Sequence, residues 1–328
     1  MQETIQRLQG GVAPALAMLA GMKLDLFTAL ATGPATAAEI AERLGVDTER
    51  LARLLYALVA AELLTEADGR FANTEEAEAF LVAGKPGYLG SAHELLSRLW
   101  HADLMTADSI RNGGPAALHD YSTASDEETR RFLTGLHASA VAAGRDLAAR
   151  FDFFSRIRSV IDIGGGSGGL LAGLCERCPG LHGTLLELPR VARIAAPMIH
   201  DSGLAARLSV AAADILTGPP AGRYDAAILR AFLQVLSRED AARAVRHAAA
   251  SLNPGGRLFI IGAGILDNDR RGPPTAVFMS VTFMNLYRAG ASYTEAEHFA
   301  WLAQAGCRDP ERILLPSGSS IIWAERPP

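Results

Sequence analysis

A run of glycines at residues 164–169 could bring a ligand close to the main chain. The segment VIDIGGGSGGLL places Gly164, Gly166 and Gly168 directly after a strand-like stretch and before a helix-like one. Glycine suits this position because the turn is tight and the ligand must approach the backbone. The same spacing also satisfies a dinucleotide-binding fingerprint, so the glycines alone do not identify the ligand.

Three acidic residues at successive strand ends narrow the choice of ligand. Asp162 lies just before the first glycine, where a carboxylate suits a cationic amine better than a pyrophosphate. Glu187 ends the next strand, about 20 residues beyond the loop, which is the usual reach for an acid that binds ribose hydroxyls. Asp214 follows the third strand and could accept from an adenine amino group, with Ile215 covering the ring. Each acid alone could simply cap a strand, but together they predict an adenosine ligand, and Asp162 favours S-adenosylmethionine.

The segment YDAAILRAFLQVLSRED at residues 224–240 raises a different question. It reads as a strand end followed by a helix start, a common place for active-site residues in an α/β enzyme. Between Leu229 and Asp240, however, it contains no histidine, cysteine, lysine or tyrosine. If this is the edge of an active site, it lacks an obvious group to move a proton.

Alternating strands and helices would position these residues. From about residue 153 onward, amphipathic helical stretches alternate with the apolar stretches SVIDI, GTLLE, RLSVAAAD, YDAAIL and GRLFIIG. This alternation predicts βαβ units and a doubly wound, mostly parallel sheet. The later segment RILLPSGSSIIWAE predicts two strands joined at residues 316–318, and therefore an antiparallel hairpin at the sheet edge.

The N-terminal part predicts a separate winged-helix domain. Residues 11–80 are rich in Ala and Leu at helical spacing, with Gly45 as a helix stop and Asp47 as an N-cap. An Asp-Gly pair in LTEADGRFANT predicts a hairpin after the second helix. That helix has only Arg50 and Arg53 as basic residues, which makes it a poor reader of DNA and favours packing or dimerisation. The expected division is a dimerisation domain at 1–85, linking helices that contribute to the substrate pocket at 86–152, and a ligand-binding domain at 153–328.

Composition limits the class of protein further. A chain of 328 residues exceeds one ordinary compact core, and a net charge of −5 argues against a nucleic-acid-binding protein. The N-terminus lacks a secretory layout and no uncharged run approaches membrane-spanning length, so we expect a cytoplasmic protein without membrane contact. Cys175 and Cys178 form a CERC pair without a second pair of ligands, so we expect them to pack in a helix and expect no metal site.

Several of these segments resemble the small-molecule O-methyltransferase family, which includes plant caffeate-type and bacterial polyketide- and carotenoid-tailoring enzymes. The matching pieces are the N-terminal winged helix and the segments VIDIGGGSGG, GTLLELPRV, AAADIL, YDAAILR and LNPGGRLFI. The resemblance runs over nearly the full length. It implies a Rossmann-like class I methyltransferase domain and an N-terminal dimerisation domain in an intertwined homodimer. That dimer would bind S-adenosylmethionine through the loop and acids above and release S-adenosylhomocysteine. Glu187 stands where the family usually has Asp, and Arg230 where it usually has a lysine beside the cofactor.

The resemblance also implies a general base at a position that cannot supply one here. The family's catalytic histidine falls on Gln234, and the two glutamates that orient it fall near Gly262 and Ser292. An amide cannot take a proton, whereas a thioether or a neutral amine attacks with a lone pair and needs no base at that step. We therefore expect S-methylation of a thioether, with a neutral amine second. Methylation of 4-methylthio-2-hydroxybutyrate, on the route to dimethylsulfoniopropionate, is a precedent among relatives of the family.

Three alternatives remain open. An O-methyltransferase of a phenol or other hydroxylated natural product could use a relocated base, for which His137 and His101 are the candidates. A non-methylating enzyme could use the positive charge of the bound cofactor, and a cofactor-binding regulator could use the winged helix on DNA. Aromatic faces would hold a sulfonium product well. The residues expected to contact the substrate are Trp100, His101, Tyr121, Phe283 and Tyr287.

Overall fold

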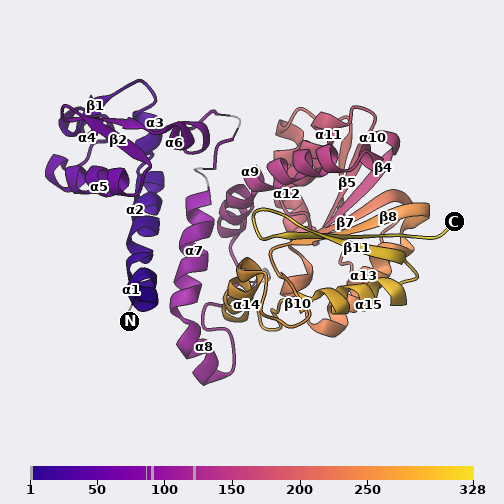
Figure 1. Cartoon of the computed structure of the whole chain (residues 1–328). Coiled ribbons are helices and arrows are strands. Elements are labelled where there is room, and N and C mark those ends of the chain that lie inside the picture. Colours follow the sequence, from indigo (N-terminus) through magenta and orange to yellow (C-terminus); the bar gives the residue numbers. More distant parts are fainter. Residues whose placement is uncertain (1–2, 86, 90–91, 121–122) are drawn as a thin grey trace. The chain divides into compact units, whose positions relative to one another are not determined.

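The chain separates into two compact units, residues 1–97 and 98–328. The computed structural model describes residues 3–85, 87–89, 92–120 and 123–328 (Figure 1). Each unit has a hydrophobic core of its own. Within the described residues, no helix is both long and apolar enough to cross a membrane. The finer division at residues 85 and 152 stays a prediction.

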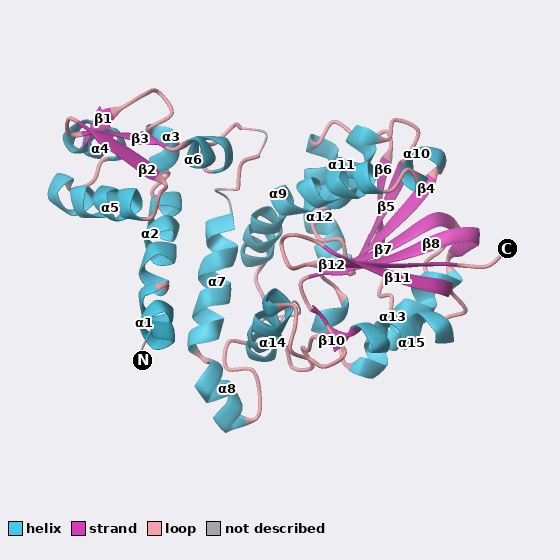
Figure 2. Cartoon of the chain, viewed as in Figure 1, coloured by secondary structure: helices cyan, strands magenta, loops and turns pink. Residues whose placement is uncertain are grey.

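The first unit combines helices with a small three-stranded antiparallel sheet of order β1-β3-β2 (Figure 2). Its strands are β1 (Ala35–Thr36), β2 (Leu64–Ala67) and β3 (Arg70–Asn73). Its helices are α1 (Glu3–Gly10), α2 (Val12–Lys23), α3 (Leu26–Ala29), α4 (Ala37–Leu44), α5 (Thr48–Ala60) and α6 (Glu75–Phe80). Helix α7 (His93–Leu104) begins in this unit and ends in the next.

Local signals account for the winged-helix pattern of this unit. Gly45 ends α4 in the left-handed conformation, and the Asp47 side chain accepts a hydrogen bond from the Arg50 N–H at the start of α5. Asp68 and Gly69 both have positive φ, at 50° and 74°, as a two-residue hairpin between β2 and β3 requires. The predicted winged helix is therefore confirmed.

The second unit is built on a seven-stranded sheet of order β11-β12-β8-β7-β4-β5-β6. The five strands from β8 to β6 run parallel, while β12 pairs antiparallel with both β8 and β11, so the predicted edge hairpin is confirmed. A separate two-stranded parallel sheet joins β9 to β10. The strands are β4 (Ser159–Ile163), β5 (His182–Glu187), β6 (Leu208–Ala212), β7 (Tyr224–Arg230), β8 (Leu252–Gly262), β9 (Ile265–Leu266), β10 (Tyr293–Thr294), β11 (Arg308–Leu314) and β12 (Ser320–Glu325).

Helices cover both faces of this sheet and bury a separate apolar cluster on each (Figure 1). One cluster lies under α9, α11 and α12, and the other under α13 and α15. This is the doubly wound arrangement that the sequence predicts. The helices are α8 (Thr106–Asn112), α9 (Asp126–Arg150), α10 (Phe153–Arg156), α11 (Gly169–Arg177), α12 (Pro189–Asp201), α13 (Arg238–Ala250), α14 (Pro274–Leu286) and α15 (Glu295–Gln304), with the short 3-10 helix η2 (Leu233–Val235).

Helices α9 and α11 touch through their backbones. A Cβ atom on Gly144 would lie 2.1 Å from the carbonyl oxygen of Leu170, and one on Gly173 would lie 2.1 Å from that of Val141. Only glycine permits so close a crossing. This contact fixes the long helix α9 against the helix that follows the glycine loop.

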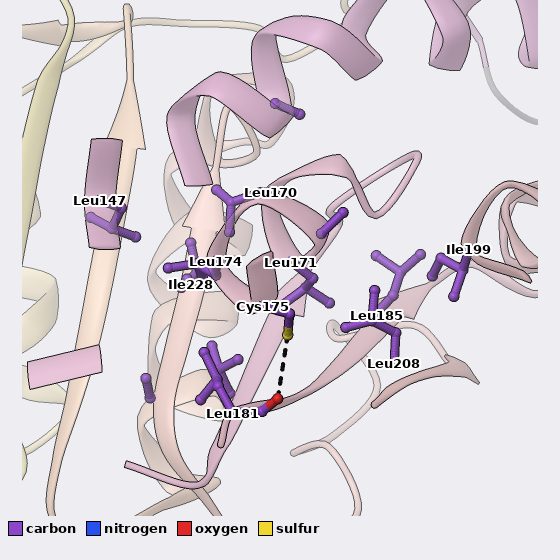
Figure 3. Packing of buried hydrophobic residues seen from close by; sticks show 14 of the residues in the cluster. Leu147, Leu170, Leu171, Leu174, Cys175, Leu181, Leu185, Ile199, Leu208 and Ile228 are labelled. Atoms are coloured by element: carbon purple, nitrogen blue, oxygen red, sulfur yellow. Dashed lines mark hydrogen bonds between the residues drawn. The ribbon is translucent and has the colours of Figure 1, made fainter. Parts of the chain in front are cut away.

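The CERC cysteines pack in the core, as the sequence predicts. Cys175 lies in α11 among Leu171, Leu174 and Leu181, and its thiol donates to the Leu181 carbonyl at 3.4 Å (Figure 3). Cys178 is buried just after the helix, and both thiols are free. Burial raises the pKa of the Cys175 thiol to about 11, which disfavours the reactive thiolate. Within the described part of the chain, no cluster of three or more metal-binding side chains is present.

Candidate active site

The glycine loop between β4 and α11 makes the tight turn that its sequence predicts. Gly164, Gly166 and Gly168 all have left-handed backbones, with φ of 67°, 61° and 73°. Side chains close around them, since a Cβ on Gly164 would lie 2.4 Å from the Phe232 ring. A Cβ on Gly168 would lie 2.8 Å from Ile199. The loop therefore turns tightly beneath these side chains at the carboxyl edge of the parallel strands, where ligands bind in such folds.

Asp162 is the most unusual ionisable group at this edge. Its side chain is fully buried, and no donor in the described part of the chain reaches either carboxylate oxygen. Burial raises the pKa of Asp162 to about 7; Arg230 opposes this shift and Glu187 adds to it. A buried carboxylate without a hydrogen bond is costly, so a cationic ligand group would supply what it lacks. The environment of Asp162 suits the amine-binding role that the sequence predicts, and that role stays a prediction.

Glu187 and Arg230 lie at the ends of the two strands that flank β4. Glu187 accepts hydrogen bonds from the main-chain N–H of Gly166 at 2.9 Å and of Leu188 at 3.0 Å. Burial raises the pKa of Glu187, and these two hydrogen bonds oppose that shift. Arg230 contacts the Ser139 hydroxyl at 3.4 Å, and burial lowers the pKa of its guanidinium. The structure thus brings Asp162, Glu187 and Arg230 together beside the loop.

Asp214 and Ile215, which follow β6, differ in their exposure. Asp214 is half-buried, and its carboxylate accepts from the Leu216 N–H at 2.8 Å. Ile215 is buried in the core, and its carbonyl receives the Nδ1 proton of His247 at 2.6 Å. Its side chain therefore packs inward, whereas Leu216 is only partly buried. The expectation that Ile215 covers a ligand ring stays a prediction.

His137 contacts the glycine loop. Its Nδ1 lies 3.0 Å from the hydroxyl of Ser167, which also accepts from the Gly169 N–H. Burial lowers the pKa of His137. The geometry ties His137 to the cofactor side of the site, and the expectation that it acts as a base or contacts substrate stays a prediction.

Gln234 lies in η2, immediately after the strand that ends in Arg230. Ala231 makes the turn with φ of 51°, a strained conformation for a residue with a side chain. A Cβ on Gly262 would lie 3.8 Å from the Gln234 side-chain oxygen, and one on Gly264 would lie 3.3 Å from the Ser292 hydroxyl. Gln234, Gly262 and Ser292, onto which the resemblance places a base and its two supports, therefore lie near one another around Gly264, and none of them is an acid or a base. Their assignment to those roles stays a prediction.

The five predicted substrate residues differ in their surroundings. Phe283 on α14 is buried, Tyr287 directly after that helix is half-buried, and their ring centroids are 6.3 Å apart. Trp100 is half-buried and His101 is exposed on α7. Tyr121 lies outside the described residues.

Comparison with known proteins shows which family the chain belongs to. Residues 110–308 match the O-methyltransferase domain, and residues 6–83 match the O-methyltransferase dimerisation domain. The chain belongs to the O-methyltransferase family. It is 33% identical to the 3-hydroxy-5-methyl-1-naphthoate 3-O-methyltransferase of Streptomyces sahachiroi, over 93% of this chain and 90% of that protein. It is 31% identical to the aclacinomycin 10-hydroxylase RdmB of Streptomyces purpurascens, over 95% of this chain and 87% of that protein.

Solved structures give the same fold. Human N-acetylserotonin methyltransferase in complex with S-adenosylmethionine aligns with a TM-score of 0.86 at 22% identity, over 99% of this chain and 97% of that one. As a member of the O-methyltransferase family, the present chain is an S-adenosylmethionine-dependent methyltransferase. The fit of that cofactor is visible here in the unsatisfied oxygens of Asp162 and in the glycine loop beside them.

Sequence reasoning missed three residues that the structure places in the site. Gly165 is one, because a Cβ there would lie 2.2 Å from the Asp162 carboxylate. Ser167, the partner of His137, is another; its position in the glycine loop was the only available signal. His298 lines a pocket with Gln234, and no local pattern in the segment EAEHFAW indicates this.

Proposed function

We propose that the protein transfers the methyl group of S-adenosylmethionine to a hydroxyl oxygen of a small metabolite. The observation that carries the cofactor half of this proposal is Asp162, which is fully buried with neither oxygen hydrogen-bonded by a described residue. The full-length similarity to a naphthoate O-methyltransferase supports oxygen as the acceptor atom. It also favours an aromatic hydroxyl within a natural-product scaffold as the substrate class.

The cofactor would be held from the carboxyl edge of the sheet. We assign Asp162 to the ligand's ammonium group, Glu187 to the ribose hydroxyls and Asp214 to the adenine amino group, with Gly164, Gly166 and Gly168 giving access to the backbone. Arg230 lies close enough to Asp162 to offset the charge of that carboxylate. When bound, the cofactor supplies an activated methyl group, and the chain's task is to orient the acceptor and accept its proton.

Sulfur methylation of a thioether is a second candidate, and neutral amine attack a third. The observation that favours them is the absence of an acid or base at Gln234, Gly262 and Ser292. A thioether such as 4-methylthio-2-hydroxybutyrate has no proton to lose, so Gln234 would suffice to orient it. Trp100, Phe283 and Tyr287 are then candidates to face the cationic product.

We also propose a homodimer formed through the first unit. The dimerisation-domain match covers residues 6–83. Ile5, Leu8, Val12 and Leu16 are exposed at helical spacing along α1 and α2, which gives that unit an apolar face of the kind that interfaces cover.

The test is a product assay with acceptors of each class. The purified protein would be incubated with S-adenosylmethionine and with naphthols, hydroxynaphthoates, 4-methylthio-2-hydroxybutyrate or aliphatic amines. S-adenosylhomocysteine and the methylated product would be measured together by mass spectrometry. We expect stoichiometric formation of both with a hydroxylated aromatic compound. Turnover of the thioether or the amine alone would refute oxygen as the acceptor, and an oxygenated product without S-adenosylhomocysteine would refute methyl transfer.

A further inference from the structure

A small pocket lies beside Gln234, where β7, β8 and the start of α15 come together. Gln234, Gly262 and Gly264 form one side of it, and Tyr293 and His298 contribute from the other. The rest of the lining is apolar, and the pocket has room for about one water molecule. The pocket therefore occupies the region where this chain has small or neutral side chains in place of the family's base and its supports.

The hydrogen bond that His298 makes leaves one of its ring nitrogens able to accept a proton. Its ring is buried, and Nδ1 lies 2.8 Å from the carbonyl oxygen of Thr294. A carbonyl oxygen only accepts, so Nδ1 must carry the proton. In the neutral ring this leaves Nε2 as the nitrogen with a free lone pair. The packing of Tyr293 and Trp301 against the ring, with centroids 6.4 and 5.2 Å away, fixes its orientation.

Two polar side chains that line the pocket, His298 and Gln234, have atoms without a hydrogen-bond partner among the described residues. The hydroxyl of Tyr293 already donates to the Leu236 carbonyl at 2.6 Å. By contrast, neither Nε2 of His298 nor the side-chain amide of Gln234 is hydrogen-bonded by another residue that the structure describes. A water molecule or a hydroxyl group between them could bond to both.

We propose that His298 accepts the proton of the acceptor hydroxyl, relayed through the pocket beside Gln234; this inference rests on the proposed oxygen methylation. In the step, the acceptor forms an O–CH₃ bond as the S–CH₃ bond breaks and the sulfonium becomes a neutral thioether. The O–H bond of the acceptor breaks, and a pocket water takes that proton and passes one of its own to Nε2. The ring becomes an imidazolium, and charge is conserved. Gln234 orients the water and the hydroxyl without exchanging a proton.

The charges around His298 favour the neutral ring before the step. Burial lowers the pKa of His298 to about 4, Glu297 opposes this shift, and Arg312 adds to it. Glu297 is itself paired with Arg238 and Arg270. Arg312 is in turn paired with Asp267 and Glu295, so little net charge faces the ring.

The test compares two variants of His298 over a series of phenols of graded acidity. His298→Asn keeps a donor for the Thr294 carbonyl and removes the acceptor at Nε2. His298→Gln places a neutral hydrogen-bond acceptor near the position of Nε2. It replaces His298→Asn in the same measurements if that variant folds poorly. His200→Asn, which changes an exposed histidine on α12, is the matched control. Thermal unfolding and S-adenosylhomocysteine affinity would be measured for each.

We expect His298→Asn to lower kcat at least 30-fold for weakly acidic phenols and less than threefold for phenols already ionised at the assay pH. Affinity for S-adenosylhomocysteine should change less than twofold. Equal losses across the series would overturn the proposal, because they indicate a structural role, and so would unchanged rates. If the wild-type protein methylates no hydroxyl compound but does methylate a thioether, the proposed function fails and no proton acceptor is needed. A steeper dependence of kcat on phenol acidity in His298→Asn than in the wild-type protein supports the proposal. Failure of the proposed function is seen in the wild-type protein itself, so the two failures are distinguishable.

Discussion

The two halves of the active site differ in how much space they leave. On the cofactor side, a Cβ on Gly165 would lie 2.2 Å from the Asp162 carboxylate. On the acceptor side, the nearest atoms to a Cβ on Gly262 lie 3.8 Å away, and a pocket opens beside Gln234. In the cofactor half, a methyl group added at Gly164, Gly165 or Gly168 would collide with a neighbouring side chain, whereas Gly262 in the acceptor half leaves room for one. The 31% identity to a hydroxylase over 95% of the chain fits this difference.

Gly165→Ala should have the largest effect, because the added methyl group would collide with a buried carboxylate next to a tight turn. We expect affinity for S-adenosylhomocysteine to fall about 5- to 150-fold, since overpacking of this kind costs about 1–3 kcal/mol and each 1.4 kcal/mol is tenfold. Isothermal titration calorimetry would measure this. Gly218→Ala is the control, because nothing lies within 4 Å of a Cβ there. A Kd within threefold of wild type would show that the cofactor half is less rigid than described.

Asp162→Asn should have the next largest effect on cofactor binding. Loss of a charge-assisted contact costs about 1.5–3 kcal/mol, so affinity for S-adenosylmethionine should fall about 10–100-fold. In the wild-type protein, a cationic ligand favours the ionised carboxylate, whose pKa in the free protein is about 7. Affinity should therefore fall about tenfold per pH unit below pH 7 and level off above it. The variant should lose this dependence, and a variant that keeps it would show that another group titrates.

The same substitution should act in the opposite direction on the free protein. The pKa of Asp162 in the folded state lies above its ordinary value of 3.8, so the folded state binds this proton more tightly than the unfolded state. The carboxyl therefore lowers stability increasingly as pH rises from about 4 to 7. At pH 8 without cofactor, we expect Asp162→Asn to raise Tm by several degrees. A lower Tm at that pH would contradict the assignment of Asp162 as a costly buried charge.

His137→Phe should have a smaller effect, confined to the cofactor half. The ring is kept while the contact with the Ser167 hydroxyl is lost, which corresponds to about 0.5–1.5 kcal/mol or a 3–10-fold weaker Kd for S-adenosylhomocysteine. The KM for the acceptor should not change. If kcat instead falls sharply while cofactor affinity is retained, His137 is the base. It then belongs to the acceptor half of the active site and not to the cofactor half.

Gly262→Ala should have the smallest effect and only on the acceptor side. The added methyl group meets no atom closer than 3.8 Å, so the protein should remain folded with unchanged cofactor affinity. It reduces the room beside Gln234, and we expect kcat to fall about 2–5-fold, which corresponds to less than about 1 kcal/mol. A steady-state assay with the preferred acceptor would measure this. A parallel loss of cofactor affinity would show that the two halves are coupled.

Local signals explain why much of the fold and of the cofactor half could be predicted from the sequence. Gly45 and the Asp68–Gly69 pair determine helix ends and turns through their own backbones. Asp162 and Glu187 could be placed because parallel strands bring their carboxyl ends to one edge. The residues of the acceptor half could not be predicted from local signals of this kind. His298 and Gln234 line the same pocket although they lie far apart in the sequence, and Ile215 is buried among apolar residues of the core.

The glycine crossing of α9 and α11 has a consequence for motion. With backbones this close, neither helix can slide along the other without a collision of main-chain atoms, so the two move as one block. Leu133 and His137 then keep their distance from the loop throughout the reaction cycle. Amide hydrogen exchange should be slowest along this pair. By contrast, α14 contacts α7 and α8 through side-chain hydrogen bonds from Thr282 to Asp103 and from Asn285 to Thr106, which can break without a collision of main-chain atoms.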